Sequence, residues 1–167
     1  LNTPGASASG SGLCMSGATC FVGSALIDSV ENGQQGKDLW ASGSISFLFD
    51  AAILGALPNA VGIVWTDGSG AITFEAFDAS NQSLGILTGN HADSSFTGGK
   101  DEDRFYGLTS LVGIARIVIS NTAGGIEVDH LQYGLQGEAP ESVPEPGTLA
   151  LLGLGLVGLA LGRRRRV

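Results

Sequence analysis

The C-terminal end of the chain constrains the fold most, because three segments that need different environments follow one another there. Residues 149–161 contain only Leu, Ala, Val and Gly. Pro144 and Pro146 precede this run, fix φ and remove two backbone N–H donors, so no helix or central strand continues into it. Four arginines come directly before the last residue: Arg163, Arg164, Arg165 and Arg166. The apolar run is therefore expected to form an element of its own.

Two interpretations of this run are open. As a helix that rises about 1.5 Å per residue it is about 20 Å long, less than the roughly 30 Å hydrocarbon core of a bilayer. Apolarity alone therefore fits a buried C-terminal core helix as well. The lack of a polar face and the positively charged end favour a membrane helix over residues 148–162, with its arginines on the cytoplasmic side. We expect this helix to lie apart from the preceding domain.

The tail as a whole resembles the PEP-CTERM sorting signal of Gram-negative bacteria. That signal has a Pro-Glu-Pro motif, a short hydrophobic helix and an Arg-rich end, matched here by Pro144-Glu145-Pro146, residues 149–161 and residues 163–166. The resemblance implies that an exosortase, a membrane transpeptidase-like enzyme, recognises and processes residues 144–167. It implies an exported protein that is anchored transiently in the inner membrane and then reaches the cell surface or an exopolysaccharide matrix such as a biofilm.

The charge distribution limits the partners of the remaining chain. Four of the eight basic residues are the terminal arginines, so residues 1–162 carry four basic against 16 acidic residues, a net charge of −12. Such a body does not offer the basic surface that nucleic acid requires. It stays soluble and can hold divalent cations. Because residue 1 is Leu, we expect an export signal to precede it in the precursor.

The body is predicted to be all-β, a β-sandwich or jelly roll over residues 21–137, followed by a linker at residues 138–143. The 27 glycines and 14% charged residues of the whole chain suit short strands joined by turns. We predict a hairpin with its turn at residues 67–70, a second turn at residues 122–125 and a long surface loop at residues 89–103. A turn or short helix is expected at residues 51–57. The expected strands are residues 44–50, 61–66, 71–77, 83–88, 104–109, 115–120 and 126–133.

Residues 1–20 are expected to form a flexible arm, exposed over residues 1–12, with a small loop closed by Cys14 and Cys20. These are the only two cysteines of the chain, and an exported protein with one close pair favours a disulfide. Metal binding by the two thiols is the alternative interpretation.

The body also resembles galactose-binding-like (discoidin-type) β-sandwiches. Residues 25–28, 39–42 and 45–50 are similar to their opening loop, Trp-containing segment and first core strand, and residues 125–134 to their closing strand. The resemblance implies a structural calcium ion where the first loop meets the last strand, with Asp28 and Glu127 as carboxylate ligands. Calcium prefers such hard oxygen ligands. The alternative is that both are ordinary surface carboxylates.

The remaining chemistry of the body points to binding rather than catalysis. His91 and His130 lie in no recognisable nucleophile motif, and the chain has no Gly-x-Ser-x-Gly elbow, so we predict that it is not an enzyme. Trp65 lies in an apolar strand and is expected in the core. Trp40 is the candidate ligand contact, since an exposed indole can stack on a sugar ring. Two functions follow: a structural or interaction protein of the cell surface, or a carbohydrate-binding module that uses Trp40.

Overall fold

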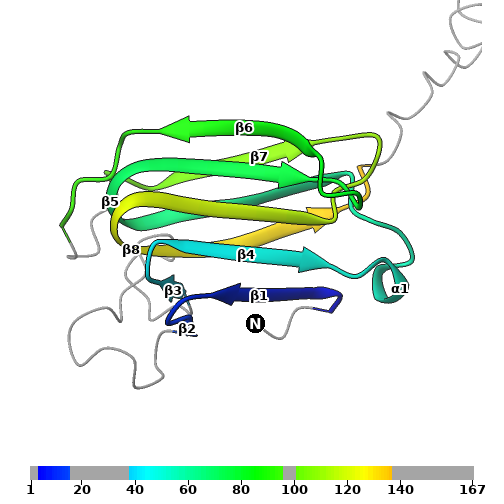
Figure 1. Cartoon of the computed structure of the whole chain (residues 1–167), viewed down its shortest axis with the longest axis horizontal. Coiled ribbons are helices and arrows are strands. Elements are labelled where there is room, and N and C mark those ends of the chain that lie inside the picture. The colour runs from blue at the N-terminus through cyan, green and yellow to red at the C-terminus, as the bar shows by residue number, and fades with distance from the viewer. Residues whose placement is uncertain (1–3, 16–37, 96–100, 137–167) are drawn as a thin grey trace, which may run out of the picture. The chain divides into compact units, whose positions relative to one another are not determined.

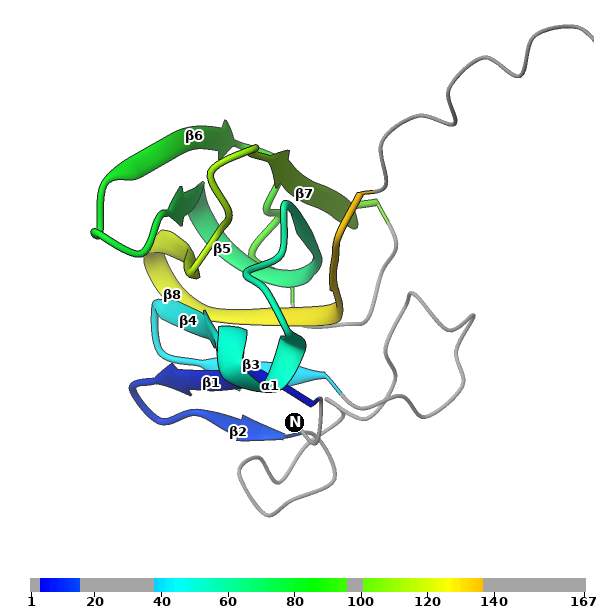
Figure 2. The same ribbon diagram turned by 90° about the vertical axis from the view of Figure 1, so that its right-hand side faces the viewer.

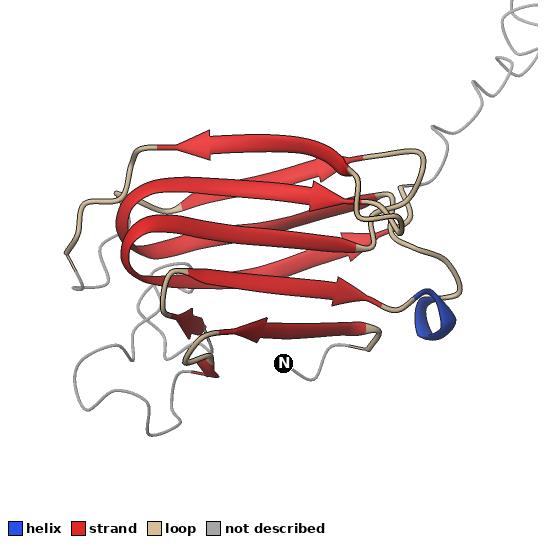
Figure 3. Cartoon of the chain, in the orientation of Figure 1, coloured by secondary structure: helices blue, strands red, loops and turns tan. Residues whose placement is uncertain are grey.

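The computed structural model describes residues 4–15, 38–95 and 101–136, which form an all-β fold with one short helix (Figure 1; Figure 3). All eight strands belong to a single antiparallel sheet. In chain order the elements are β1 Ala6–Gly10, β2 Cys14–Met15, β3 Leu39–Ala41, β4 Ser44–Phe49, α1 Ala51–Leu54, β5 Ala60–Phe77, β6 Ser83–Gly89, β7 Arg104–Thr109 and β8 Arg116–Gly134.

Two long strands, β5 and β8, organise the sheet. They pair with each other from Ala60 opposite Gly134 to Phe77 opposite Arg116, and both bend midway, as Figure 1 shows at its left side. On one side of the bend the strand order is β6-β5-β8-β4-β1, and on the other side it is β7-β5-β8-β3-β2. The sheet is thus folded on itself into two layers, which Figure 2 shows from the end.

Two predictions about the glycine-rich stretches are therefore wrong: the hairpin with its turn at residues 67–70, and the separate strands on either side of residues 122–125. Both glycine-rich stretches remain in their strands and bend together, with register shifts between β5 and β8 at this point. Gly68 and Gly70 have φ of 153° and 81°, which glycine adopts without strain. The Asn121 side-chain amide joins the two bends by donating to the carbonyls of Ser69 and Gly125, each at 2.8 Å. The stretches bend rather than reverse because they pair with each other.

One hydrophobic core fills the space between the layers. The inward positions of β4 are Ile45, Phe47 and Phe49, which are buried as their alternation predicts. Aromatic pairs cross from layer to layer: Phe74 stacks on Tyr106 with ring centroids 6.2 Å apart, and Phe49 packs on Tyr133 at 5.1 Å. Other fully buried side chains are Ile63, Trp65, Ile72, Ile114, Ile117, Ile119, Ile126 and Val128.

The N-terminal prediction also needs correction. Residues 6–10 are not an exposed arm but form β1, which pairs with β4 from Ala6 opposite Phe49 to Gly10 opposite Ile45. The Ser- and Ala-rich sequence has little apolar surface to bury. Its backbone N–H and C=O groups nevertheless form hydrogen bonds with those at the edge of β4. The short helix is confirmed as α1. It begins where Asp50 accepts a 2.8 Å hydrogen bond from the Ala52 N–H, and it ends at Gly55 in the left-handed conformation.

Several predictions concern segments outside the described residues. These include Asp28, Cys20, the linker at residues 138–143 and the tail at residues 144–167. Within the residues that the structure describes, no helix is long and apolar enough to cross a membrane.

Alanine at Gly68 tests the bend. A Cβ there would lie 2.5 Å from Trp65 Cζ2 and 2.8 Å from the Gly125 carbonyl oxygen, in a backbone conformation that side chains disfavour. We expect Gly68→Ala to lower the free energy of unfolding by about 1–3 kcal/mol in urea denaturation. Gly134→Ala is the control, because its Cβ would meet nothing within 4 Å. Equal stability of the two variants would contradict the described bend.

Candidate functional site

Buried acidic side chains gather at the bend of the sheet. Asp38, Asp67 and Glu102 are only 3%, 7% and 3% exposed, and Glu127 is partly buried beside them. Together these four residues form what we term the acidic cluster. Carboxylates are rarely buried to this extent unless they are paired or bind a cation, because transfer from water disfavours the charged form.

Each member is held by a different part of the fold. Asp38 precedes β3, Asp67 lies at the bend of β5, Glu102 precedes β7, and Glu127 lies in β8. Since the neighbours of Glu127 in β8 are buried in the core, Glu127 faces away from it. The Thr66 hydroxyl donates to Glu127 Oε1 at 3.2 Å.

Described residues between β6 and β7 lie against the bend. The Asp93 N–H donates to Glu102 Oε2 at 3.4 Å, and the Ser94 N–H donates to the Gly68 carbonyl at 3.2 Å. His91 in the same loop bonds to the Tyr106 hydroxyl at 2.7 Å, and burial lowers the pKa of the imidazole. The predicted surface loop therefore lies partly on the core, and His91 contributes to its packing.

Three carboxyl groups of the cluster, those of Asp67, Glu102 and Glu127, have raised pKa values. Burial, followed by a hydrogen bond and the charge from Asp38, raises the pKa of Glu127 to about 9. Burial and the charges of Asp67 and Asp93 raise the pKa of Glu102 to about 7. Burial also raises the pKa of Asp67 to about 6, although the Gly68 amide opposes the shift. The cluster thus resists full ionisation at neutral pH.

The structure brings together two residues predicted from the sequence. Trp40 and Glu127 are direct partners in the β3–β8 register. The indole of Trp40 is partly buried and packs on Gly125, where a Cβ would lie 2.6 Å from Trp40 Nε1. The indole of Trp40 therefore lies partly covered beside the acidic cluster, rather than forming an open platform on which a sugar ring could stack.

Other predicted site residues remain untested. Cys14 lies in β2 opposite Trp40 and is disulfide-bonded. Its predicted partner Cys20 lies outside the described residues, so the pairing stays a prediction. The same holds for Asp28 as a calcium ligand. Across residues 4–15, 38–95 and 101–136, no three acidic, histidine or cysteine side chains are arranged to hold a metal ion. His130 pairs with Asp129 at 2.6 Å, away from the core.

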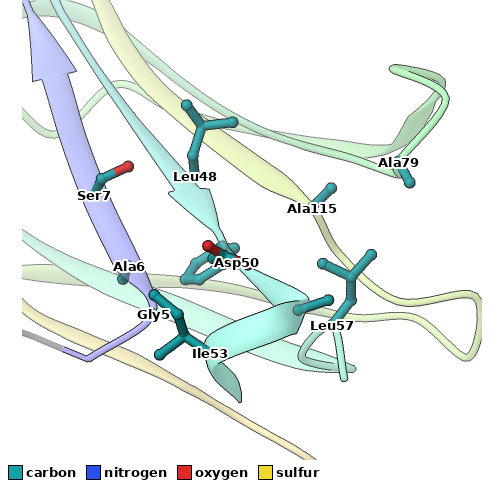
Figure 4. A pocket seen from close by; sticks show the side chains of 11 residues that line it. Gly5, Ala6, Ser7, Leu48, Asp50, Ile53, Leu57, Ala79 and Ala115 are labelled. Atoms are coloured by element: carbon teal, nitrogen blue, oxygen red, sulfur yellow. The ribbon is translucent and has the colours of Figure 1, made fainter. Parts of the chain in front are cut away.

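Two apolar grooves lie on the outside of the described domain. One, of about 590 Å³, lies between β1, the end of β4 and α1, with Leu48, Ile53 and Leu57 among its lining residues (Figure 4). The other, of about 530 Å³, lies over β5, β7 and β8 and contains Phe105, which is 58% exposed. The Phe105 ring covers Gly62, since a Cβ at Gly62 would overlap it.

Sequence reasoning did not identify Phe105, although a signal was present. Adjacent residues of a strand face opposite sides of the sheet, so one ring of the pair Phe105-Tyr106 had to point outward. Tyr106 is the buried member, at 6% exposure. An exposed aromatic ring beside the polar side chains of Thr109 and Gln132 has the character of a ligand contact.

Comparison with known proteins places the clearest functional signal outside this domain. Residues 142–166 match the PEP-CTERM protein-sorting motif. The match includes Pro144, Glu145 and Pro146, the apolar run and the arginines, as the resemblance of the tail predicted. The motif indicates an exported, membrane-anchored protein that an exosortase processes. No curated protein matches the chain, and the likeness of the body to discoidin-type sandwiches stays a prediction.

Proposed function

We propose that the chain is a structural or interaction protein of the cell surface or the extracellular matrix, delivered there through its tail. The sorting motif at residues 142–166 carries this proposal. The body is consistent with it, because an all-β domain with excess negative charge stays soluble and repels other anionic surfaces after release. The tail specifies where the protein goes, and the β-domain performs its role there.

Cell fractionation tests this proposal. In a host that has an exosortase, the full chain behind an export signal should pass from the inner membrane to the surface or the medium. Deletion of residues 144–167 should leave the protein unanchored in the periplasm. Asp101→Asn, which changes an exposed carboxylate of the body, serves as the control and should not alter fractionation. The same distribution for the deletion variant and the full chain would contradict the proposal.

A carbohydrate-binding module is the second candidate, and the groove around Phe105 is the observation that favours it. A solvent-exposed ring beside an amide and a hydroxyl resembles the combination of an apolar platform and polar contacts that sugars require. Trp40, proposed for this role from the sequence, is partly covered and lies near the acidic cluster.

Glycan-array binding separates these two aromatic residues. If the Phe105 groove binds sugar, Phe105→Ala should weaken binding by at least about tenfold, because exposed aromatic contacts often contribute more than 1 kcal/mol. Leu111→Ala, which alters another fully exposed apolar side chain, is the control and should bind normally. Loss of binding in Trp40→Ala alone would move the site to the acidic cluster. Absence of binding to every glycan would eliminate this candidate.

A further inference from the structure

β6 is an edge strand of the sheet with one open side. Within the described residues it pairs only with β5, and Figure 1 shows it as the outermost strand of its layer. Its pairing with β5 is regular from Gly85 to Gly89, because the one register shift falls at its start, between Ala76 and Phe77 of β5. Alternate backbone N–H and C=O groups of such a strand point away from its neighbour and can pair with another strand.

The sequence of β6 lacks the residues that usually protect an edge strand. Ser83–Gly89 contains no charged residue and no proline. The other edge strands differ, because β1 has no large apolar side chain, β2 has only two residues and β7 begins with Arg104. A neutral and apolar edge of this length is a surface to which another strand can add.

Apolar side chains are exposed on both faces of β6. Leu87 lies opposite the fully buried Phe74 and therefore faces the core, yet it is 39% exposed. Its neighbour Ile86 faces outward and is 56% exposed. β7 lies beside β6 at this side of the domain, and Leu108 of β7 packs over Gly85, where a Cβ would lie 2.6 Å from Leu108 Cδ1 (Figure 2). A strand added to β6 would cover the apolar surface that β7 leaves exposed.

We propose that β6 pairs with β6 of a second copy of this chain, antiparallel and about a two-fold axis. The charge of the body favours a second copy as the partner. Because residues 1–162 carry a net charge of −12, two copies can approach closely only through a neutral surface, which β6 provides. Glu75, opposite Ile86 in β5, would lie three strand spacings from Glu75 of the other copy, about 14 Å, which exceeds the roughly 10 Å Debye length at 0.1 M salt. A basic partner, in contrast, would find no carboxylate on β6.

The interface uses the full length of β6 when the two-fold axis passes through its central residue, Ile86. The two Ile86 side chains then lie opposite each other, and Leu87 of each copy lies opposite Gly85 of the other, so the larger side chain meets the smallest residue. The pairing continues the layer β1-β4-β8-β5-β6 into the same layer of the second copy. This interface rests on the fold of the body and does not depend on the sorting function of the tail.

Sedimentation equilibrium of the full chain in excess mild detergent tests the interface. The wild-type protein should pass from monomer to dimer between about 1 μM and about 1 mM, the range of weak association. Ile86→Lys should raise the dissociation constant at least about tenfold, because it places two positive charges opposite each other. Leu111→Lys, which adds the same charge at a fully exposed position outside the strands, should leave the dissociation constant unchanged. Both changes affect exposed side chains, and unchanged urea midpoints would show that the variants are folded.

Cysteine cross-linking tests the register. Under mild oxidation Ile86→Cys should form a disulfide-linked dimer. Thr88→Cys, on the same face of β6, should not, because the two Thr88 residues would lie about 13 Å apart along the strands. A wild-type protein that stays monomeric, a dimer that persists unchanged in Ile86→Lys, or equal cross-linking of both cysteine variants would overturn the proposal. Association that is lost only when residues 149–161 are deleted would also overturn it, because the apolar run would then be the interface.

Discussion

Replacing Phe47 by alanine is expected to lower the free energy of unfolding by about 3–5 kcal/mol, a large part of the roughly 5–15 kcal/mol that stabilises a typical domain. Phe47 is fully buried at the centre of β4, between the two layers of the sheet. The variant loses the transfer free energy of the ring and leaves a cavity that the rigid strands cannot close.

Leu48→Ala is the matched control for this variant. Leu48 follows Phe47 in the same strand but points outward and is 49% exposed. Urea denaturation should show a loss of no more than about 1 kcal/mol for this change. Similar losses in the two variants would mean that the inner and outer faces of β4 are assigned incorrectly.

The second large effect is a fall in stability as the pH rises, in the presence of a chelator. The folded protein raises the pKa of Asp67 from 3.8 to about 6, of Glu102 from 4.5 to about 7, and of Glu127 from 4.5 to about 9. Between about pH 4 and pH 9 the folded state therefore binds more protons than the unfolded state. The stability contributed by these protonated groups is complete below about pH 4 and is lost as the pH rises through the folded pKa values.

Urea midpoints measured from pH 4.5 to pH 8.5 in chelator should show this loss, on the order of a few kcal/mol. Glu127→Gln should flatten the profile, because the amide does not titrate. Glu75→Gln should leave the profile unchanged. A stability that increases over this range, as for carboxylates in ion pairs, would contradict the described environment of the cluster.

The sequence predicted those parts of the fold that depend on local pattern. The alternation in residues 44–50 predicted β4, and the short runs at residues 83–88 and 104–109 predicted β6 and β7 almost to the residue. It did not predict the continuity of β5 and β8. A stretch such as Asp67-Gly68-Ser69-Gly70 has the same composition whether the chain reverses or bends. The outcome depends on pairing with residues 121–126, which are more than 50 positions away.

The acidic cluster, like the continuity of β5 and β8, could not be predicted from local sequence. Glu127 was selected through a resemblance, but an aspartate before a strand or in a Gly-rich stretch is common on protein surfaces. Nothing local marks Asp38 or Asp67 as buried. At the bend, the Ser94 N–H donates to the Gly68 carbonyl and the Asp93 N–H to Glu102, and such contacts between residues distant in sequence carry no local signal. Trp40 lies opposite Glu127 because of the β3–β8 register, which the sequence did not predict.

The tail, in contrast, could be interpreted without a structure, because its signal is linear. Pro144, Glu145 and Pro146, the apolar run and the terminal arginines retain their meaning irrespective of tertiary contacts. The sorting signal can therefore be identified from the sequence alone, whereas the acidic cluster depends on the fold.

The most direct test of this account is the C-terminal mass of the protein isolated from the cell surface or the medium. With an active exosortase, mass spectrometry should show a protein that lacks Arg163, Arg164, Arg165 and Arg166 together with the apolar run. Replacing Pro144, Glu145 and Pro146 by alanine should leave the tail intact and the protein in the inner membrane. A surface protein that retains its four arginines, or equal processing without exosortase, would contradict the account.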